Sequence, residues 1–194
     1  MEAFDMSGIR SQFDARTSKW GISDIFNYHR GADDDFSAHM DLCSNLCVSK
    51  DVVEFGFRWG QSTAAFLITA NSVVSYDINP CMQPREIFEE AAAVDGLKWE
   101  FREGDSLKAG PADCDILFID TDHTADQIYA ELNIHHVGVR EGGLIIMHDT
   151  QTFGQMKGSI NKFMDENQQW GVLDHFTNCH GLTVLHRGPS TQNL

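Results

Sequence analysis

Short apolar runs recur along this chain, and each is followed by glycine or polar residues and then by apolar positions at helical spacing. The runs lie at 52–55, 72–76, 99–102, 115–119 and 144–147. Most are apolar at consecutive positions, which is typical of parallel strands that helices cover on both faces. Helices are predicted over about 36–47, 64–68, 85–93, 128–136 and 159–167. This alternation of strand and helix predicts an α/β fold.

The end of the chain has a different pattern. Residues 172–176 and 182–185 are strand-like segments joined through Asn178 to Gly181, which predicts a β-hairpin. The length of 194 residues suits one domain with a sizeable core. We therefore predict a single domain over residues 1–194, with residues 1–35 as its N-terminal extension.

A glycine-bracketed turn follows the first strand, in the sequence VVEFGFRWG at 52–60. Glu54 lies near the end of the strand, Gly56 and Gly60 bracket the turn, and Ser62 lies at the start of the next helix. Such a turn lets backbone N–H groups approach a ligand. The spacing fits neither the G-x-G-x-x-G fingerprint of dinucleotide-binding proteins nor a P-loop. An ordinary strand, turn and helix without a ligand is the alternative.

The E-x-G-x-x-x-G pattern resembles the first motif of class I S-adenosylmethionine-dependent methyltransferases, with Arg58 in place of the usual middle glycine. The resemblance covers about residues 40–187. It implies a Rossmann-like, doubly wound, mostly parallel seven-stranded sheet that an antiparallel C-terminal hairpin closes. It also implies that S-adenosylmethionine is bound at the turn, and that the extension over residues 1–35 covers the substrate side.

Two further segments are candidates for contacts with this cofactor. Asp77 ends the second strand, 21 residues beyond Gly56, where an acid can accept both hydroxyls of a ribose. The alternative is that Asp77 caps the following helix. In the resembling family the loop after the third strand touches the adenine, which implies that role for Gly104, Asp105 and Ser106. An ordinary turn would explain the same three residues.

Acidic residues lie at or near the ends of five successive strands, at Glu54, Asp77, Asp105, Asp120 and Asp149. In an open parallel sheet, ligands bind outside the carboxyl ends of the strands. Folding alone does not explain an acid at every one of these positions. The pattern therefore predicts a ligand site along this edge of the sheet.

The motifs FIDTDH at 118–123 and MHDT at 147–150 narrow the resemblance. They are similar to small-molecule O-methyltransferases that need a divalent metal: the catechol type, the sugar and macrolide type, and the cephalosporin-hydroxylase-like group. This similarity implies that Asp120, His148 and Asp149 bind Mg²⁺ or Mn²⁺. Asp120 and His123 would be catalytic, with His123 as the base, because an imidazole titrates near neutral pH.

Each of these residues also has a structural explanation. Asp120 and Asp149 can be N-caps of the helices that follow them. His148 can form a hydrogen bond within the core or orient Asp149, and His123 can cap a helix or support a ligand from outside. Asp120 and Asp149 alone would suit magnesium, and manganese or another transition metal becomes competitive if His148 is also a ligand.

Other polar groups are predicted to be structural. These are the five histidines at positions 135, 136, 175, 180 and 186, and the acidic tract Asp33–Asp35, which suits a solvated helix start. Cys43 and Cys47 are four residues apart on a predicted helix and are expected to be buried. Residues 151–158 are a hypothetical mobile flap over the site.

Charge and composition limit the partners. The chain has 14 Lys and Arg against 29 Asp and Glu, a net charge of −15, which disfavours binding to nucleic acid or to an anionic membrane. The five cysteines form no C-x-x-C pair, so neither disulfides nor a zinc site is indicated. We expect a cytoplasmic protein that acts on a small-molecule acceptor, with a homodimer as one option for its oligomeric state.

Three functions remain after these steps. The first is metal-assisted O-methylation of a small molecule or a sugar hydroxyl with S-adenosylmethionine. The second is methylation by a protein of the same fold that uses S-adenosylmethionine without a metal. The third is a non-catalytic protein that binds the cofactor or a nucleoside, against which the acids after the fourth and fifth strands argue.

Overall fold

The computed structural model describes residues 20–32 and 36–189. The acidic tract Asp33–Asp35 and residues 1–19 of the predicted extension lie outside these ranges. A seven-stranded sheet has the order β3-β2-β1-β4-β5-β7-β6. Its strands are β1 (Asp51–Phe55), β2 (Ser72–Asp77), β3 (Trp99–Glu103), β4 (Cys114–Ile119), β5 (Val139–His148), β6 (Trp170–Phe176) and β7 (Leu182–Arg187).

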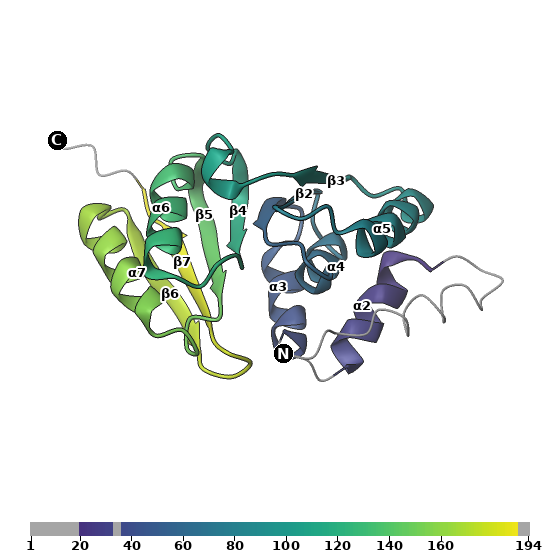
Figure 1. Ribbon diagram of the computed structural model, residues 1–194, viewed down its shortest axis with the longest axis horizontal. Helices are drawn as coiled ribbons and strands as arrows, with labels where there is room; N and C mark the ends of the chain where they lie inside the picture. Colours follow the sequence, from purple (N-terminus) through teal and green to yellow (C-terminus); the bar gives the residue numbers. More distant parts are fainter. Residues whose placement is uncertain (1–19, 33–35, 190–194) are drawn as a thin grey trace.

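Helices connect most of the strands, and Figure 1 shows α6 and α7 grouped at one end of the molecule and α2, α4 and α5 at the other. They are α2 (Ile22–Gly31), α3 (Met40–Leu46), α4 (Gln61–Leu67), α5 (Met82–Asp95), α6 (Ala125–His135) and α7 (Gln155–Glu166), with short 3-10 turns η1 (Ser37–His39) and η2 (Ser106–Lys108). Strands β1 to β5 are parallel, and β7 is antiparallel to β5 and β6. The predicted Rossmann-like fold with a C-terminal hairpin is confirmed.

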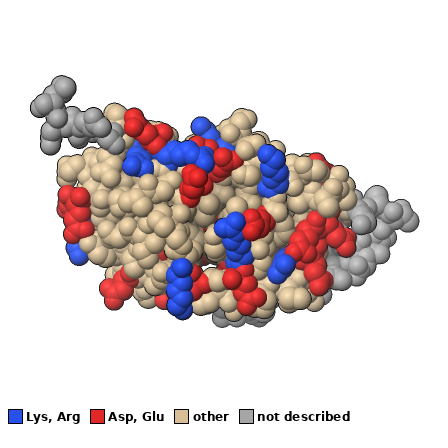
Figure 2. Space-filling model, turned by 90° about the horizontal axis from the view of Figure 1, so that it is seen from above, with Lys and Arg blue, Asp and Glu red and all other residues tan. Residues whose placement is uncertain are grey.

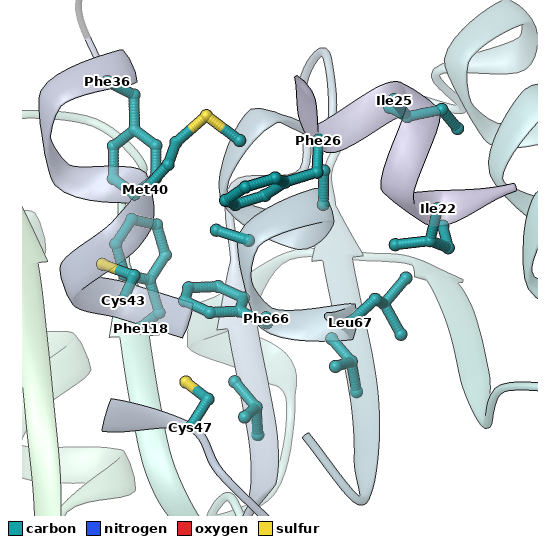
Figure 3. Packing of buried hydrophobic residues seen from close by; sticks show 14 of the residues in the cluster. Ile22, Ile25, Phe26, Phe36, Met40, Cys43, Cys47, Phe66, Leu67 and Phe118 are labelled. Carbon is teal, nitrogen blue, oxygen red and sulfur yellow. The ribbon is translucent and has the colours of Figure 1, made fainter. Parts of the chain in front are cut away.

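The core is divided by the sheet because successive strand residues point to opposite faces. In β4, Ile116 and Phe118 belong to the core cluster that contains α3 and α4, whereas Leu117 and Ile119 belong to the cluster that contains α6 and α7. Figure 3 shows the first cluster around Phe118. The rings of Phe36 and Phe66 pack edge-on against Phe118, with centroids 5.7 and 5.1 Å away.

Helix α2 is the described part of the N-terminal extension, and it packs against α4 and α5. Its apolar residues Ile22, Ile25 and Phe26 are buried in the first core cluster. The backbone N–H of Ile22 donates a hydrogen bond of 2.7 Å to Oδ2 of Asp95, at the end of α5. The apolar face of α2 is therefore part of the core. The substrate-side cover that we predict for residues 1–35 stays a prediction.

Two boundaries differ from the sequence predictions. The glycine pair Gly142–Gly143, predicted to be a turn before a strand at 144–147, lies inside the longer β5. Gly142 has a φ of +76°, and the register with β4 shifts between Cys114 and Ile116, so the glycines form an irregularity within the strand. Helix α7 begins at Gln155 instead of about residue 159, so the second half of the predicted flap at 151–158 is helical.

The connection between β3 and β4 contains the short turn η2 in place of a full helix over residues 104–113. The neighbouring sheet surface is polar: Nη1 of Arg102 donates to the Tyr76 hydroxyl at 2.7 Å, and its guanidinium pairs with Glu100. The turn also places Ser106 beside the carboxyl ends of the strands, where it lines a cavity of about 580 Å³. No helix within the described ranges has the length and apolarity that a membrane crossing requires.

Candidate functional site

The glycine turn between β1 and α4 depends on two glycines. Gly56 has a φ of +99°, and a Cβ atom there would lie 1.9 Å from the carbonyl oxygen of Asp120. Gly60 has a φ of +78°, and a Cβ atom there would lie 2.4 Å from the ring of Phe88. Both positions therefore exclude a side chain on steric grounds as well as by conformation. The close approach at Gly56 brings the end of β1 against the end of β4.

Arg58 has a backbone conformation that glycine adopts more readily than other residues. Its φ is +44°, in the left-handed region that favours glycine. Its backbone N–H donates a 2.8 Å hydrogen bond to Oδ2 of Asp77, which lies at the end of β2. Arg58 therefore links the turn to the end of β2 through its backbone.

Glu54 and Ser62, both predicted to bind the cofactor, hydrogen-bond to each other. Glu54 is fully buried, and its carboxylate accepts hydrogen bonds from the hydroxyls of Ser62, Thr63 and Ser75. Burial raises the pKa of Glu54 to about 7, although the three hydroxyls oppose this shift. Glu54 thus ties β1 to β2 and α4 beneath the turn, and its carboxylate is committed to these side chains.

A cavity of about 580 Å³ opens beside the turn, at the carboxyl ends of β1, β2 and β4. Its lining is formed by Phe55, Gly56, Arg58, Tyr76, Asp77, Ile78, Asn79, Gly104, Asp105, Ser106, Leu107, Asp120, Thr121, Asp122 and Gln127. The predicted residues Gly56, Asp77, Gly104, Asp105 and Ser106 are among them. A smaller adjoining cavity is lined in part by Ser62, Asp120 and His148.

Asp77 faces the large cavity and does not cap a helix. Helix α5 begins at Met82, and the residue at its N-cap position is Cys81. Oδ1 of Asp77 accepts hydrogen bonds from the backbone N–H and the side-chain amide of Asn79, at 2.8 and 3.3 Å. These bonds, with the one from Arg58, hold the carboxylate in place in the cavity wall.

Asp105 caps the short turn η2, and the alternative for its loop was an ordinary turn. Its Oδ1 accepts the backbone N–H of Leu107 at 2.9 Å, at the start of η2. Its Oδ2 lies 3.0 Å from Nζ of Lys108, and this contact together with the Leu107 bond lowers the pKa of Asp105. Asp105 therefore shapes the loop and also lines the cavity.

Three predicted residues meet at the ends of β4 and β5. Asp120, His123 and Asp149 each offer an oxygen or nitrogen atom, and these atoms lie within 4.8 Å of one another. Nε2 of His123 is 3.2 Å from Oδ1 of Asp120 and 2.8 Å from Oδ2 of Asp149. Burial lowers the pKa of His123, but the two carboxylates outweigh it and raise the pKa to about 9. Burial also opposes ionisation of Asp120, yet His123 and His148 hold its pKa well below the usual range.

His148 approaches the same two carboxylates from the buried side. Its Nδ1 lies 3.6 Å from Oδ2 of Asp120 and 3.7 Å from Oδ1 of Asp149, and its side chain is 2% exposed. Its Nε2 lies 3.0 Å from the carbonyl oxygen of Cys179, at the tip of the β6–β7 hairpin. Because a carbonyl only accepts, Nε2 carries a hydrogen, and in the neutral ring the lone pair of Nδ1 faces the carboxylates.

The helix N-cap explanation fails for both acids of this group. Helix α6 follows Thr124, whose hydroxyl accepts the backbone N–H of Gln127 at 3.3 Å, and α7 follows Gly154. Asp149 has a φ of +62°, so its backbone is in the left-handed region. Such a conformation in a non-glycine residue is uncommon and is often found at functional sites.

The segment after β5, predicted as a flap over the site, lies against His123. The ring of Phe153 stacks on the ring of His123 with centroids 4.4 Å apart. The side-chain amide of Gln155 donates to the backbone oxygen of His123 at 2.9 Å. Backbone N–H groups of Gln151 and Thr152 donate to the carbonyl of His180. The predicted flap is thus attached to the hairpin, and its mobility stays a hypothesis.

Three of the five histidines predicted to be structural form contacts within the protein. Nε2 of the buried His135 is 3.0 Å from the backbone oxygen of Ser106. Nδ1 of His175 is 2.9 Å from the Thr183 hydroxyl, and Nδ1 of His180 is 2.9 Å from the Thr152 hydroxyl. Two buried residues near the site were not predicted: His39, which contacts the backbone oxygen of Asn178, and Glu131 beneath the cavity wall.

The chain matches a known family through the segment that carries this site. The sequence profile of the methyltransferase domain family matches residues 53–150, about half of the chain. That segment runs from β1 to the end of β5 and contains the glycine turn and the Asp120 group. A comparison with curated proteins finds no match.

Solved structures show the same fold at low sequence identity. The N-methyltransferase NodS from Bradyrhizobium japonicum WM9, in complex with S-adenosyl-L-homocysteine, has a TM-score of 0.60 and 12% identity over 96% of this chain and 100% of that one. A protein from Klebsiella pneumoniae described as an O-methyltransferase has a TM-score of 0.59 and 16% identity over 94% and 97%. A Streptococcus mutans protein described as a SAM-dependent methyltransferase has a TM-score of 0.59 and 18% identity. This chain spans only 48% of that longer protein and is itself covered over 78%.

Proposed function

This chain belongs to the methyltransferase domain family, and we propose that it transfers the methyl group of S-adenosylmethionine to a hydroxyl oxygen of a small molecule with the help of a divalent cation. One observation carries the proposal. Asp120 lines the large cavity and also belongs to the group of Asp120, His123 and Asp149. A cofactor in the cavity and a reacting hydroxyl at the acidic group would therefore be neighbours.

The cavity suits the proposed cofactor in size and chemistry. Its volume of about 580 Å³ lies within the usual range for small-molecule sites. The Asp77 carboxylate is available to accept ribose hydroxyls, and Ile78 and Leu107 add exposed apolar surface to the lining. The glycine turn, which is free of side chains at Gly56, would let the rest of the cofactor pass close to the backbone.

The donor set suits a divalent cation. Carboxylates of Asp120 and Asp149 and the Nδ1 atom of His148 would hold it, and the Cys179 carbonyl would fix the tautomer of His148. Two carboxylates with an imidazole favour Mn²⁺ or another transition metal over Mg²⁺. When bound, such a cation would lower the pKa of an acceptor hydroxyl.

His123 is the proposed base, and its protonation state sets a condition on that role. With a pKa of about 9, its ring is an imidazolium at neutral pH as long as no other cation lies beside Asp120 and Asp149. The ring can accept a proton from an acceptor hydroxyl only after another cation neutralises Asp120 and Asp149. Holding that hydroxyl in line with the sulfonium methyl group would supply much of the rate enhancement, ~7 kcal/mol or more.

The charge of the protein limits its partners. On the face shown in Figure 2, Lys and Arg side chains lie scattered among Asp and Glu side chains and do not gather into a basic patch. The net charge of −15 would repel a nucleic-acid backbone or an anionic membrane. We therefore take the acceptor to be a small molecule or sugar and the protein to act in the cytoplasm.

Calorimetric titration of the purified full chain tests this proposal. S-adenosylhomocysteine is titrated alone and after addition of MnCl₂ or MgCl₂, with the Asp77→Ala and Asp120→Ala variants alongside. We expect micromolar nucleoside binding that Asp77→Ala abolishes and a separate metal signal that Asp120→Ala abolishes. Nucleoside binding without a metal signal would favour a metal-independent methyltransferase. Absence of both signals would refute the proposed function.

A further inference from the structure

We propose that the buried His39 is a positioning residue for His148, and that it acts on this proposed metal ligand through the tip of the β6–β7 hairpin. The inference rests on the proposed function, because it concerns the cation site proposed at Asp120, Asp149 and His148. His39 lies at the end of η1, 139 residues before Asn178 of the hairpin tip, and it is 1% exposed.

Two buried histidines contact neighbouring carbonyl groups of this tip. Nε2 of His39 lies 3.1 Å from the backbone oxygen of Asn178. Nε2 of His148 lies 3.0 Å from the backbone oxygen of Cys179, which is the next residue. Because a carbonyl only accepts, both Nε2 atoms carry a hydrogen. The two histidines are therefore held by consecutive peptide groups of one short segment.

The backbone of the tip has a conformation that needs support from outside the hairpin. Cys179 and His180 have φ values of +45° and +64°, in the left-handed region that is unfavourable for residues other than glycine. Such a backbone persists only where its surroundings hold it. The ring of His39 holds the carbonyl before that of Cys179, and the backbone N–H groups of residues 151 and 152 hold the carbonyl after it. The direction of the Cys179 carbonyl therefore depends on both contacts.

Ring packing keeps His39 in place for this contact. The ring of Phe36 lies edge-on to the rings of His39 and His148, with centroids 6.1 and 5.2 Å away. The centroids of the two histidine rings are 5.9 Å apart, and Phe176 at the end of β6 lies 6.0 Å from His39. His39 is thus enclosed between the segment before α3 and the hairpin.

The Cys179 carbonyl determines which nitrogen of His148 is available to a cation. Nδ1 of His148 lies 3.6 Å from Oδ2 of Asp120. A neutral ring that is released from the carbonyl would be able to carry its hydrogen on Nδ1 and donate it to that carboxylate. A nitrogen that carries a hydrogen does not bind a metal. By holding the tip, His39 therefore keeps the lone pair of His148 directed at the cation site.

The first test is the Mn²⁺ affinity of the full chain, measured by electron paramagnetic resonance of the free ion. His39→Leu should bind Mn²⁺ about 10-fold more weakly, although every proposed ligand is still present, because groups that orient a ligand affect metal affinity to this extent. The side-chain amide of His39→Gln can donate to the Asn178 carbonyl, so this variant should restore most of the affinity.

The second test needs no metal. Nitrogen NMR of the metal-free chain at about pH 8.5, above the ordinary imidazole pKa of about 6.5, locates the hydrogen on the ring of His148. It should be on Nε2 in the wild type and in His39→Gln. In His39→Leu a share of the protein should have it on Nδ1. A role of His39 in packing alone would not change this distribution.

His135→Leu is the matched control. His135 is also fully buried with its Nε2 3.0 Å from a backbone carbonyl, but it lies on α6, at the opposite face of the sheet. This variant should lose stability in urea as His39→Leu does and should bind Mn²⁺ like the wild type. If His39→Leu does not fold, His39→Phe, which keeps a ring and removes the donor, takes its place.

Three results would each overturn the inference. They are wild-type Mn²⁺ affinity in the folded His39→Leu variant, failure of His39→Gln to restore the affinity, and a hydrogen on Nδ1 of His148 in the wild type. Absence of Mn²⁺ binding in the wild type would instead refute the metal in the proposed function, and the NMR comparison alone would then decide whether His39 positions His148.

Discussion

Nδ1 of His148 lies 3.6 Å from Oδ2 of Asp120, on the side of the ring opposite the contact between Nε2 and the Cys179 carbonyl. The carbonyl contact assigns the hydrogen to Nε2, so the neutral ring presents a lone pair to a carboxylate. That arrangement is favourable only when a proton or a metal cation lies between the two groups. The roles proposed for the two histidines, a ligand for His148 and a base for His123, are therefore different, and single substitutions can test them.

The first prediction concerns Mn²⁺ affinity, followed by electron paramagnetic resonance of the free ion. Asp120→Asn and His148→Gln should each weaken binding by at least about 10-fold, because each removes a proposed ligand. His123→Gln should leave the affinity at pH 7 equal or higher, because it removes an imidazolium that competes for the same carboxylates.

Asp126→Asn, on the exposed face of α6, is the matched control and should bind Mn²⁺ like the wild type. If His123→Gln weakens binding as much as Asp120→Asn does, His123 is a ligand and another group must be the base. Unchanged binding in His148→Gln would contradict its assignment as a ligand.

The second prediction concerns Asp77 and the cofactor. Asp77→Asn retains the size of the side chain but replaces a carboxylate oxygen with a donor. Loss of a hydrogen bond to a charged group is worth about 1.5–3 kcal/mol, so S-adenosylhomocysteine affinity should fall by at least 10-fold. Isothermal calorimetry measures this, with Asp113→Asn as the control at the opposite end of the sheet, where Asp113 pairs with Arg140. Equal affinities for the two variants would exclude Asp77 from the binding site.

The third prediction is that Arg58→Gly stabilises the protein. A left-handed backbone costs a non-glycine residue about 1–2 kcal/mol, and glycine avoids this cost while adding about 0.5–1 kcal/mol of conformational freedom to the unfolded chain. With φ at +44°, the free energy of unfolding in urea should rise by roughly 0.5–1 kcal/mol. Arg85→Gly, inside α5, is the control and should lower it by about 1 kcal/mol. A lower free energy of unfolding in Arg58→Gly would mean that the Arg58 side chain stabilises the fold by more than its left-handed backbone destabilises it.

The fourth prediction concerns pH. Burial within α2 lowers the pKa of His29 from 6.5 to about 4, so the unfolded chain binds a proton more readily than the folded chain between these values. The stability associated with neutral His29 is fully present above pH 6.5 and is lost as the pH falls toward 4. The full loss is about 3 kcal/mol.

Urea unfolding of the wild type and of His29→Leu at pH 7.5 and pH 4.5 measures this effect. The wild type should lose about 2–3 kcal/mol more than His29→Leu across that interval, because the variant has no proton to take up. His175→Leu, a replacement of an exposed histidine on β6, controls for the substitution itself. Equal losses in the wild type and in His29→Leu would contradict the burial argument.

Much of the architecture could be predicted from local patterns. The apolar run at 115–119 became β4, and its alternate residues divide between two core clusters. Strand boundaries were less predictable at glycines, which suit either a turn or an irregular strand. Gly142 was predicted to lie in a turn, but with a φ of +76° it lies at an irregularity within β5. The start of α7 at Gln155 was also missed, because the segment before residue 159 has only a weak apolar pattern.

The sequence by itself determined the strands, the glycine turn and the presence of acids at the strand ends, because strand periodicity and glycine conformation are properties of neighbouring residues. Only the tertiary structure decided what those acids touch. It buried Glu54 against three hydroxyls, placed His123 between Asp120 and Asp149, and brought the Cys179 carbonyl to His148 from 31 residues away. Partners, burial and therefore pKa depend on how distant segments pack, and no local pattern contains that information.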